Sequence, residues 1–376
     1  MLRDGPSAEP AAAKTLHMLE FRGTGGEYFR IWIVNLALTI ITLGIYGAWA
    51  KVRTYRYFRG NMFLAGHPFD YHASPVRILI GRLIAVTVLL GYGLTARLHP
   101  LIGSAWGLVF LFVTPWLMVS SLRFNARNTS YRNVRFNFVG TMGRAARVYI
   151  LYPVLSVFTL FLAWPAVHRA RDYFIVNNHA FGGKHFSTQF SLGSIYGVYV
   201  MAIGMFIGAL AGLFAIAVGV VLVVLAIASL AGVPIHSMPQ DLRHSPFAAG
   251  IGVIGILAIV AFYLAIIFIA TLVQTYIRAR TMNLSIDNAT LEGGHQLRSE
   301  LEFMPMAWIM FTNALLVLVT IGLYYPWAVV RLTRYELSCW GIVAASDLDD
   351  FTSEAIATQG AIGEEIASFF DLGISL

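Results

Sequence analysis

"TLGIYGAWAKVRTYRY" (Thr42–Tyr57) ends an apolar stretch with a glycine, a tryptophan and then several basic residues. Near the other end of the chain, "TIGLYYPWAVVRLTRY" (Thr320–Tyr335) has the same residue at nine of sixteen positions. The aligned tryptophans Trp49 and Trp327 mark the shared register. Such agreement at fixed spacing indicates an internal repeat. We therefore predict that copies of one hydrophobic element build a single bundle.

The composition is typical of an integral membrane protein. Of the 376 residues, 58% are hydrophobic and only 12% are charged, whereas soluble domains carry about 25% charged residues. A helix needs roughly 20 apolar residues to cross a bilayer core. The strong candidate spans are residues 76–96, 101–119, 193–232 and 247–274. Because the third run is long enough for two crossings, we expect it to break between Gly208 and Gly219.

The topology of the loops leaves two arrangements open. Four basic loops resemble one another: 51–75, 120–146, 166–190 and 275–303. Basic residues mark cytoplasmic loops, so all four are expected on that side. However, only the short apolar segment 147–165 separates the second loop from the third. Either this segment and its relatives 31–49 and 305–327 are re-entrant and enclosed by protein, or loop 166–190 lies outside. The likeness of the loops favours re-entry.

Each basic loop contains a turn signal. An asparagine is followed five residues later by Gly or Asn at Asn61/Gly66, Asn128/Asn133, Asn177/Gly182 and Asn283/Asn288. These residue types tolerate positive φ and favour hairpin turns. We predict an all-α polytopic membrane protein with internal repeats and with short β-hairpins in its basic cytoplasmic loops. Unstructured polar loops are the alternative.

Three regions are expected along the chain. Residues 1–20 form a polar N-terminal tail without the apolar core of a secretory leader. Residues 21–340 form a repeat-built transmembrane bundle, and residues 341–376 form an acidic cytoplasmic tail. This tail has seven acids and no Lys or Arg, which leaves +14 on the rest of the chain. It is expected either to fold back onto the basic loops as short helices or to stay solvated.

Aromatic and basic residues at the helix ends predict contact with lipid. Trp and Tyr prefer the membrane–water boundary, and Arg prefers anionic head groups on the cytoplasmic side. The predicted lipid contacts are Trp49, Arg53, Arg56, Trp116, Arg123, Trp327, Arg331 and Arg334. Nucleic acid is not an expected partner, because the arginines are distributed among several loops instead of forming one stripe.

Polar residues recur inside the two matched segments. Asn35 and Thr42 in the first copy return as Asn313 and Thr320 in the last. An asparagine at membrane depth must form hydrogen bonds, most often with a neighbouring helix. Helix packing is therefore the simpler interpretation. The alternative is a central polar binding site between two equivalent segments, as in repeat-built transporters.

Reaction chemistry has little support. Nucleotide-binding, hydrolase and metalloprotease motifs are absent from the sequence, and all nineteen acids lie outside the apolar segments. The latter argues against a pump that couples to protons through buried acids. A zinc site at His236, Asp241 and His244 has loose spacing and no supporting motif. We expect no enzymatic activity, no metal and no cofactor.

Several stretches resemble a known family. "FRGTGGEYFRIW", "TLGIYGAWAKVRTYRY", "GHPFDYHASP" and the acidic "DLDDFTSEA" are similar to the YjgN-like bacterial inner-membrane proteins, over nearly the whole chain. The most specific part is the T-x-G-x-Y-x-x-W-A-x-x-R core. The family's usual proline before the tryptophan is Ala48 in the first copy, although Pro326 keeps it in the last. The resemblance implies a multi-pass protein of the bacterial inner (plasma) membrane and supplies no catalytic residues.

Two functions remain as hypotheses. The first is a channel or transporter for small solutes or lipids, with Asn35 and Asn313 close together in a solvent-reachable cavity. The alternative is a non-transporting membrane module that binds lipid or a partner through its basic loops.

Overall fold

The structure is a computed structural model that describes residues 14–97, 99–230 and 246–356. The chain divides into two compact units, one of Met1–Ile195 with Met282–Leu376 and one of Tyr196–Thr281. The residues considered as zinc ligands, His236, Asp241 and His244, lie outside the described residues. Most of the N-terminal tail and the end of the acidic tail also lie outside them.

Among the described residues, ten antiparallel strands of the first unit close into one barrel, with the order β1-β10-β9-β8-β7-β6-β5-β4-β3-β2. The strands are β1 (Thr15–Phe21), β2 (Met62–Leu64), β3 (His67–Tyr71), β4 (Thr129–Tyr131), β5 (Val134–Phe138), β6 (His179–Phe181), β7 (Lys184–Thr188), β8 (Ala289–Leu291), β9 (His295–Ser299) and β10 (Trp340–Ala344). The fold is mostly helical, but the predicted all-α class is too narrow because these strands form a complete barrel. The expected boundary before residue 341 falls inside β10.

Four of the barrel's hairpins come from the basic loops, as the turn signals predicted. Their turns contain residues with positive φ, for example Ala65 and Gly66 at 45° and 78°, and Arg132 and Asn133 at 47° and 66°. Positive φ at both central residues matches the twist of a two-residue hairpin turn. In the third loop Gly182 lies in the turn as predicted, with a φ of 53°. In the fourth loop the turn residues are Gly293 and Gly294, whereas Asn288 comes directly before β8, so the predicted turn position there was wrong.

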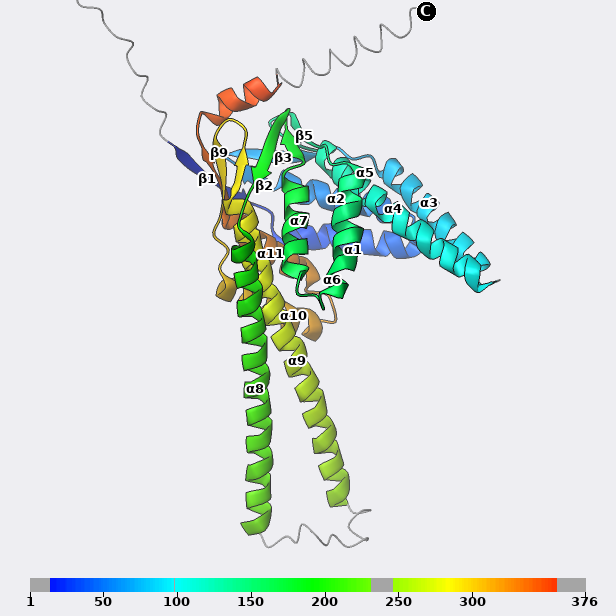
Figure 1. Ribbon diagram of the computed structural model, residues 1–376, viewed down its shortest axis with the longest axis vertical. Helices are drawn as coiled ribbons and strands as arrows, with labels where there is room; N and C mark the ends of the chain where they lie inside the picture. Colours follow the sequence, from blue (N-terminus) through cyan, green and yellow to red (C-terminus); the bar gives the residue numbers. More distant parts are fainter. Residues whose placement is uncertain (1–13, 98, 231–245, 357–376) are drawn as a thin grey trace, which may run out of the picture. The chain divides into compact units, whose positions relative to one another are not determined.

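In the described part of the chain, four helices are long and apolar enough to cross a membrane (Figure 1). They are α3 (Pro75–Thr95), α4 (Pro100–Arg127), α8 (Leu192–Leu230) and α9 (Pro246–Asp287). The predicted break between Gly208 and Gly219 is wrong, because α8 is one helix of 39 residues. Glycine keeps its backbone N–H and so continues the helical hydrogen bonds at a cost of only about 1 kcal/mol each. In an apolar environment, breaking those bonds would cost several kcal/mol.

The remaining helices are shorter and reverse direction in pairs. They are α1 (Gly25–Ile41) with α2 (Gly47–Gly60), α5 (Met142–Ala146), a π-helix η1 (Arg147–Leu151) and α6 (Tyr152–Phe158) with α7 (Trp164–Val176), and α10 (Phe303–Val319) with α11 (Tyr325–Ser338). Each reversal uses two residues with positive φ: Leu43 and Gly44, Leu160 and Phe161, or Ile321 and Gly322.

The barrel decides between the two loop arrangements. All four basic loops supply neighbouring strands to the same closed barrel, so they lie on one side. The segment 147–165 therefore turns back between α6 and α7 instead of crossing, and the arrangement with loop 166–190 outside is wrong.

Candidate functional site

The inside of the barrel is apolar. Side chains alternate between the two faces of a strand, and each of the ten strands turns one large apolar residue toward a common cavity of 160 Å³. These residues are Leu19, Leu64, Phe69, Tyr131, Phe136, Phe181, Phe186, Leu291, Leu297 and Ile342. The hydroxyl of Tyr131 is satisfied because it donates to the carbonyl of Leu64 at 2.8 Å. Barrels of about this size are filled largely by their own side chains, which explains the small volume.

A short helix, residues 348–356, covers this cavity, and we call it the barrel cap. Phe351 is buried and stacks on Phe181 with 6.1 Å between ring centroids. Ala355 is fully buried, and a Cβ on Gly182 would lie 2.6 Å from its Cβ, so glycine is required there. The acidic sequence therefore begins as a packed element of the barrel.

Charged pairs accompany this packing. Asp349 pairs with Arg132, and Glu354 pairs with Lys184 at 2.8 Å. Both carboxylates are largely exposed, and exposed ion pairs contribute about 0–1 kcal/mol each. The apolar contacts of Phe351 and Ala355 therefore hold the cap, and the charges orient it.

The predicted asparagines each form a hydrogen bond to the next helix of the same helical pair. The side-chain amide of Asn35 donates to the carbonyl of Ala50 at 3.4 Å, and that of Asn313 donates to Ala328 at 3.0 Å. Both asparagines are buried. In the last copy Arg331 also donates to the side-chain oxygen of Asn313, whereas the corresponding oxygen of Asn35 has no partner among the described residues. These bonds hold α1 to α2 and α10 to α11, and a ligand-binding role for them stays a prediction.

The two predicted threonines shape the reversals. Thr42 accepts a hydrogen bond from the backbone N–H of Tyr46, and Thr320 accepts one from Tyr324, each at 2.9 Å. Each hydroxyl also donates to the carbonyl four residues earlier, at 2.7 Å. The same residue types therefore make the same turn twice, which explains their spacing without a ligand.

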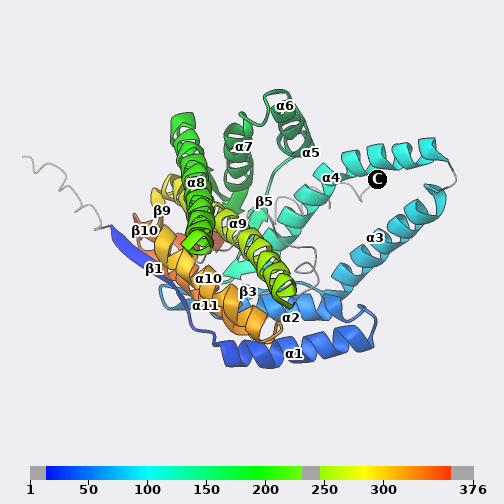
Figure 2. The same cartoon turned by 90° about the horizontal axis from the view of Figure 1, so that it is seen from below.

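The predicted tryptophans lie just after those turns. Trp49 stacks on Tyr46 with rings 13° apart, and Trp327 stacks on Tyr324 with rings 18° apart. Trp327 also stacks on Phe29 of α1, where α1 and α11 lie side by side (Figure 2). Trp116, in the middle of α4, is 48% exposed. Their contact with lipid stays a prediction, as does that of the exposed Arg53.

Five side chains hold a helix to the end of the strand pair that follows it, a role that the sequence did not suggest. In four cases the pair is a hairpin, and in the fifth it is β10 with β1. Each lies five residues before the last residue that precedes a strand. We call them the hairpin tethers: Arg56, Arg123, Tyr173, Asn283 and Arg334. Their acceptors are the carbonyls of Tyr71, Phe138, Phe190, Leu301 and Gly23, at 2.7–3.3 Å. Three of the tethers, Arg56, Arg123 and Arg334, were predicted as lipid contacts.

The family is shown by direct comparison. Residues 16–369 match the family model described as "Bacterial protein of unknown function (DUF898)". The chain belongs to the DUF898 family. This DUF898 chain is similar to the inner membrane protein YjgN of Salmonella typhimurium, with 36% identity over 147 residues, 39% of this chain and 37% of that protein. Against YjgN of Escherichia coli O157:H7 the identity is 31% over 198 residues, 52% of this chain and 48% of that protein.

The alignments thus span less than half of these curated relatives, and no solved structure matches the DUF898 chain. The names of the relatives and the four membrane-length helices confirm the predicted location in a bacterial inner membrane. Within the described residues, no group of three or more His, Cys, Asp or Glu is placed to hold a metal ion.

One acidic side chain of the DUF898 chain has an unusual proton affinity. Burial raises the pKa of Asp172, in α7, to about 7, and the nearby Arg171 lowers it only in part. His168 lies 3.8 Å away. Burial, and then Arg171, lowers the pKa of His168, so at neutral pH the imidazole offers little compensating charge. The folded protein therefore favours the neutral carboxyl.

Replacing Asp172 by asparagine is expected to stabilise the protein at pH 8 by up to about 4 kcal/mol and to change little at pH 4. The pKa is higher folded than unfolded, so its stabilising contribution is full below pH 3.9 and is lost as the pH rises through about 7. Thermal unfolding in detergent at both pH values measures this, with the exposed Asp70→Asn as control. Greater destabilisation of Asp172→Asn at pH 8 than at pH 4 would contradict it.

Proposed function

We propose that this protein is a non-transporting module of the inner membrane that binds anionic lipid on the basic, cytoplasmic side of its barrel. The observation that supports this proposal most is the hydrogen bonding of the Asn35 and Asn313 side chains. The transport hypothesis needs them in a solvent-reachable cavity, yet both amides bond to carbonyls of the next helix.

Charge supports the same proposal. Arg53, Arg144 and Arg147 are exposed and lie on helices that lead into or out of the barrel strands. Arginines near a membrane surface attract anionic head groups, by about 1 kcal/mol each. No enzymatic activity is part of this proposal, and it requires no cofactor or metal.

We also infer that the bundle and barrel are five copies of one unit, each a helical pair followed by two antiparallel strands. In four units the strands form a hairpin, and in the fifth β10 pairs with β1 from the start of the chain. Two regularities support it. The hairpin tethers occupy equivalent positions in all five units, and the three short helical pairs reverse with the same pair of positive φ values. The two remaining units have α3 with α4 and α8 with α9 in place of the short pairs.

The test compares lipid-dependent stability in detergent. Phosphatidylglycerol is expected to raise the unfolding temperature more than phosphatidylcholine does, and the difference should shrink as salt rises. The variant Arg53→Gln/Arg144→Gln/Arg147→Gln should lose most of this difference. Arg97→Gln is the matched control. Arg97 follows the C-terminal end of α3, away from the barrel strands, so this variant should keep the difference between the two lipids. An unchanged difference in the triple variant would contradict the proposal.

A channel or transporter for small solutes or lipids is the second candidate function. Its support is the cavity inside the barrel together with a cap that could be displaced. In proteoliposomes, this hypothesis expects release of an entrapped small solute to rise when residues 348–376 are removed. The lipid-binding proposal expects release to stay at the level of protein-free vesicles.

A further inference from the structure

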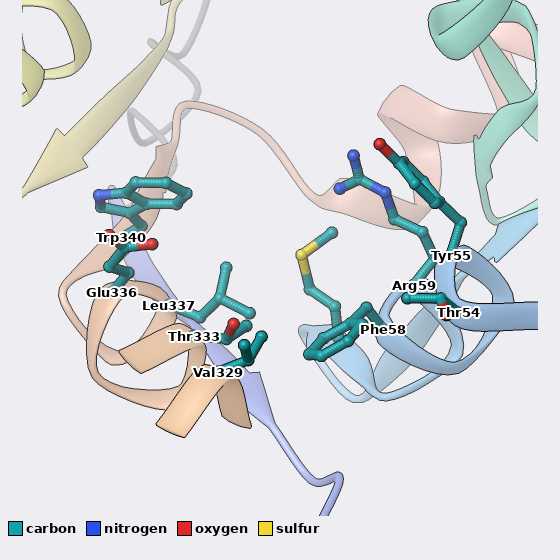
Figure 3. A pocket seen from close by; sticks show the side chains of 10 residues that line it. Thr54, Tyr55, Phe58, Arg59, Val329, Thr333, Glu336, Leu337 and Trp340 are labelled. Carbon is teal, nitrogen blue, oxygen red and sulfur yellow. The ribbon is translucent and has the colours of Figure 1, made fainter. Parts of the chain in front are cut away.

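A second pocket, of 360 Å³, lies between α2 and α11 and is separate from the barrel cavity (Figure 3). Its volume is within the range of small-molecule sites, about 300–1,000 Å³. The lining residues are Thr54, Tyr55, Phe58, Arg59, Met62, Val329, Thr333, Glu336, Leu337 and Trp340. None of them is among the predicted lipid contacts.

One wall of the pocket carries an unneutralised positive charge. Arg59 is half-buried, and burial lowers the pKa of its guanidinium. Among the described residues, no side chain or carbonyl accepts a hydrogen bond from this guanidinium, and no carboxylate forms an ion pair with it. Taking a charge out of water without a partner costs several kcal/mol. Such a cost is offset when an anion occupies the site.

A second polar group next to Arg59 also lacks a partner. Tyr71 is only 4% exposed, and its hydroxyl has no hydrogen bond within the part of the chain that the structure describes. Its ring lies 5.2 Å from that of Tyr55, whose side chain lines the pocket beside Arg59 (Figure 3). Buried hydroxyls normally have a hydrogen-bond partner. This corner of the pocket therefore holds two groups that can still donate hydrogen bonds, the guanidinium of Arg59 and the hydroxyl of Tyr71.

The rest of the pocket is suited to hydrocarbon. Phe58 and Met62 from the α2 side face Val329, Leu337 and Trp340 from the α11 side. Glu336 lies beside Trp340, across the pocket from Arg59 (Figure 3). Apolar side chains therefore line both walls of the cavity, with Arg59 on the α2 side and Glu336 on the α11 side.

We propose that this pocket binds an amphiphile with an anionic head and a hydrocarbon chain, the head on Arg59 and the chain along the apolar walls. A carboxylate or phosphate bound to a guanidinium forms charge-assisted hydrogen bonds, which are the strong ones. The inference rests on the proposed lipid binding for its ligand source, but its residues differ from Arg53, Arg144 and Arg147.

Native mass spectrometry of the full chain in detergent tests the proposal with three probes: laurate, dilauroyl phosphatidylglycerol and methyl laurate. At least one anionic probe should bind ten-fold or more tightly than the uncharged ester. Binding of laurate alone identifies a fatty acid, binding of the phosphatidylglycerol alone identifies a phospholipid, and binding of both identifies a site for either head group.

Two variants locate the site. Arg59→Gln should weaken binding of the anionic probe at least ten-fold, whereas Arg97→Gln, which changes an exposed arginine outside the pocket, should leave it unchanged. Val329→Trp keeps Arg59 and fills the apolar part of the pocket, so it should also lose binding, and it serves if Arg59→Gln does not fold. Equal affinity for the ester and the anions, or unchanged affinity in Arg59→Gln or in Val329→Trp, would overturn the inference.

The same experiment separates this site from the exposed arginines. The triple variant of Arg53, Arg144 and Arg147 should keep the ten-fold preference for the anionic probe even if it loses the stabilisation by phosphatidylglycerol. Loss of that preference in the triple variant would mean that the anion binds to the surface arginines, and it would overturn the proposal that the pocket binds the anion.

Discussion

Replacing Asn283 by alanine is expected to lower the free energy of unfolding by about 3 kcal/mol. Its amide donates to the carbonyl of Leu301 at 2.9 Å, and its oxygen accepts from the N–H of Leu301 at 3.0 Å and the hydroxyl of Ser299 at 2.7 Å. Leu301 and Ser299 are each 2% exposed. The variant therefore leaves buried polar groups unsatisfied, at about 1–3 kcal/mol each.

Asn288→Ala is the matched control for this tether. The side chain of Asn288 is exposed and makes one bond, to the carbonyl of Leu284 at 2.9 Å. Its loss should cost about 1 kcal/mol or less. Urea unfolding in detergent measures both variants. If Asn283→Ala is no less stable than Asn288→Ala, the tether does not hold the hairpin.

Phe351→Ala is expected to destabilise the barrel by about 3–5 kcal/mol, as buried phenylalanines usually do. Phe351 stacks on Phe181 and meets the ring of the fully buried His295 at 4.2 Å. Removing the ring enlarges the barrel cavity, which ten strands already enclose and which cannot easily collapse. Thermal unfolding in detergent measures the loss.

The control for the cap is Ile356→Ala on the same helix. Ile356 is 49% exposed, so its truncation should change the unfolding temperature little. Limited proteolysis adds a second measurement, because a loosened cap should be cut earlier in Phe351→Ala than in the wild type. Equal behaviour of the two variants would mean that the cap does not depend on the barrel core.

The hairpins could be predicted from sequence, and the barrel could not. A Gly or Asn turn such as Ala65–Gly66 is a local signal, because a backbone with positive φ restricts the residue type. The pairing of Phe69 with Tyr131 joins strands of three to five residues across two long helices. Strands this short carry little pattern of their own, and their partners are chosen by tertiary packing.

The matched segments were informative about geometry. Asn35 and Asn313 each donate to a carbonyl of the next helix, and such backbone acceptors are marked by no sequence pattern. The tethers show a further limit. Tyr173 and Asn283 do with a phenol and an amide what Arg56 does with a guanidinium, so comparing residue types could not group them.

The pairing of β1 with β10 has a consequence for biosynthesis. Thr15 is registered against Ala344, so the seam of the barrel can be made only after the ribosome has translated nearly the whole described chain. Until then β1 and β9 each keep an open edge, and open edges invite pairing with other polypeptides. A protein truncated before residue 340 would therefore expose unpaired strand edges. We expect such a fragment to aggregate and to be degraded by membrane proteases, and not to function as a smaller protein.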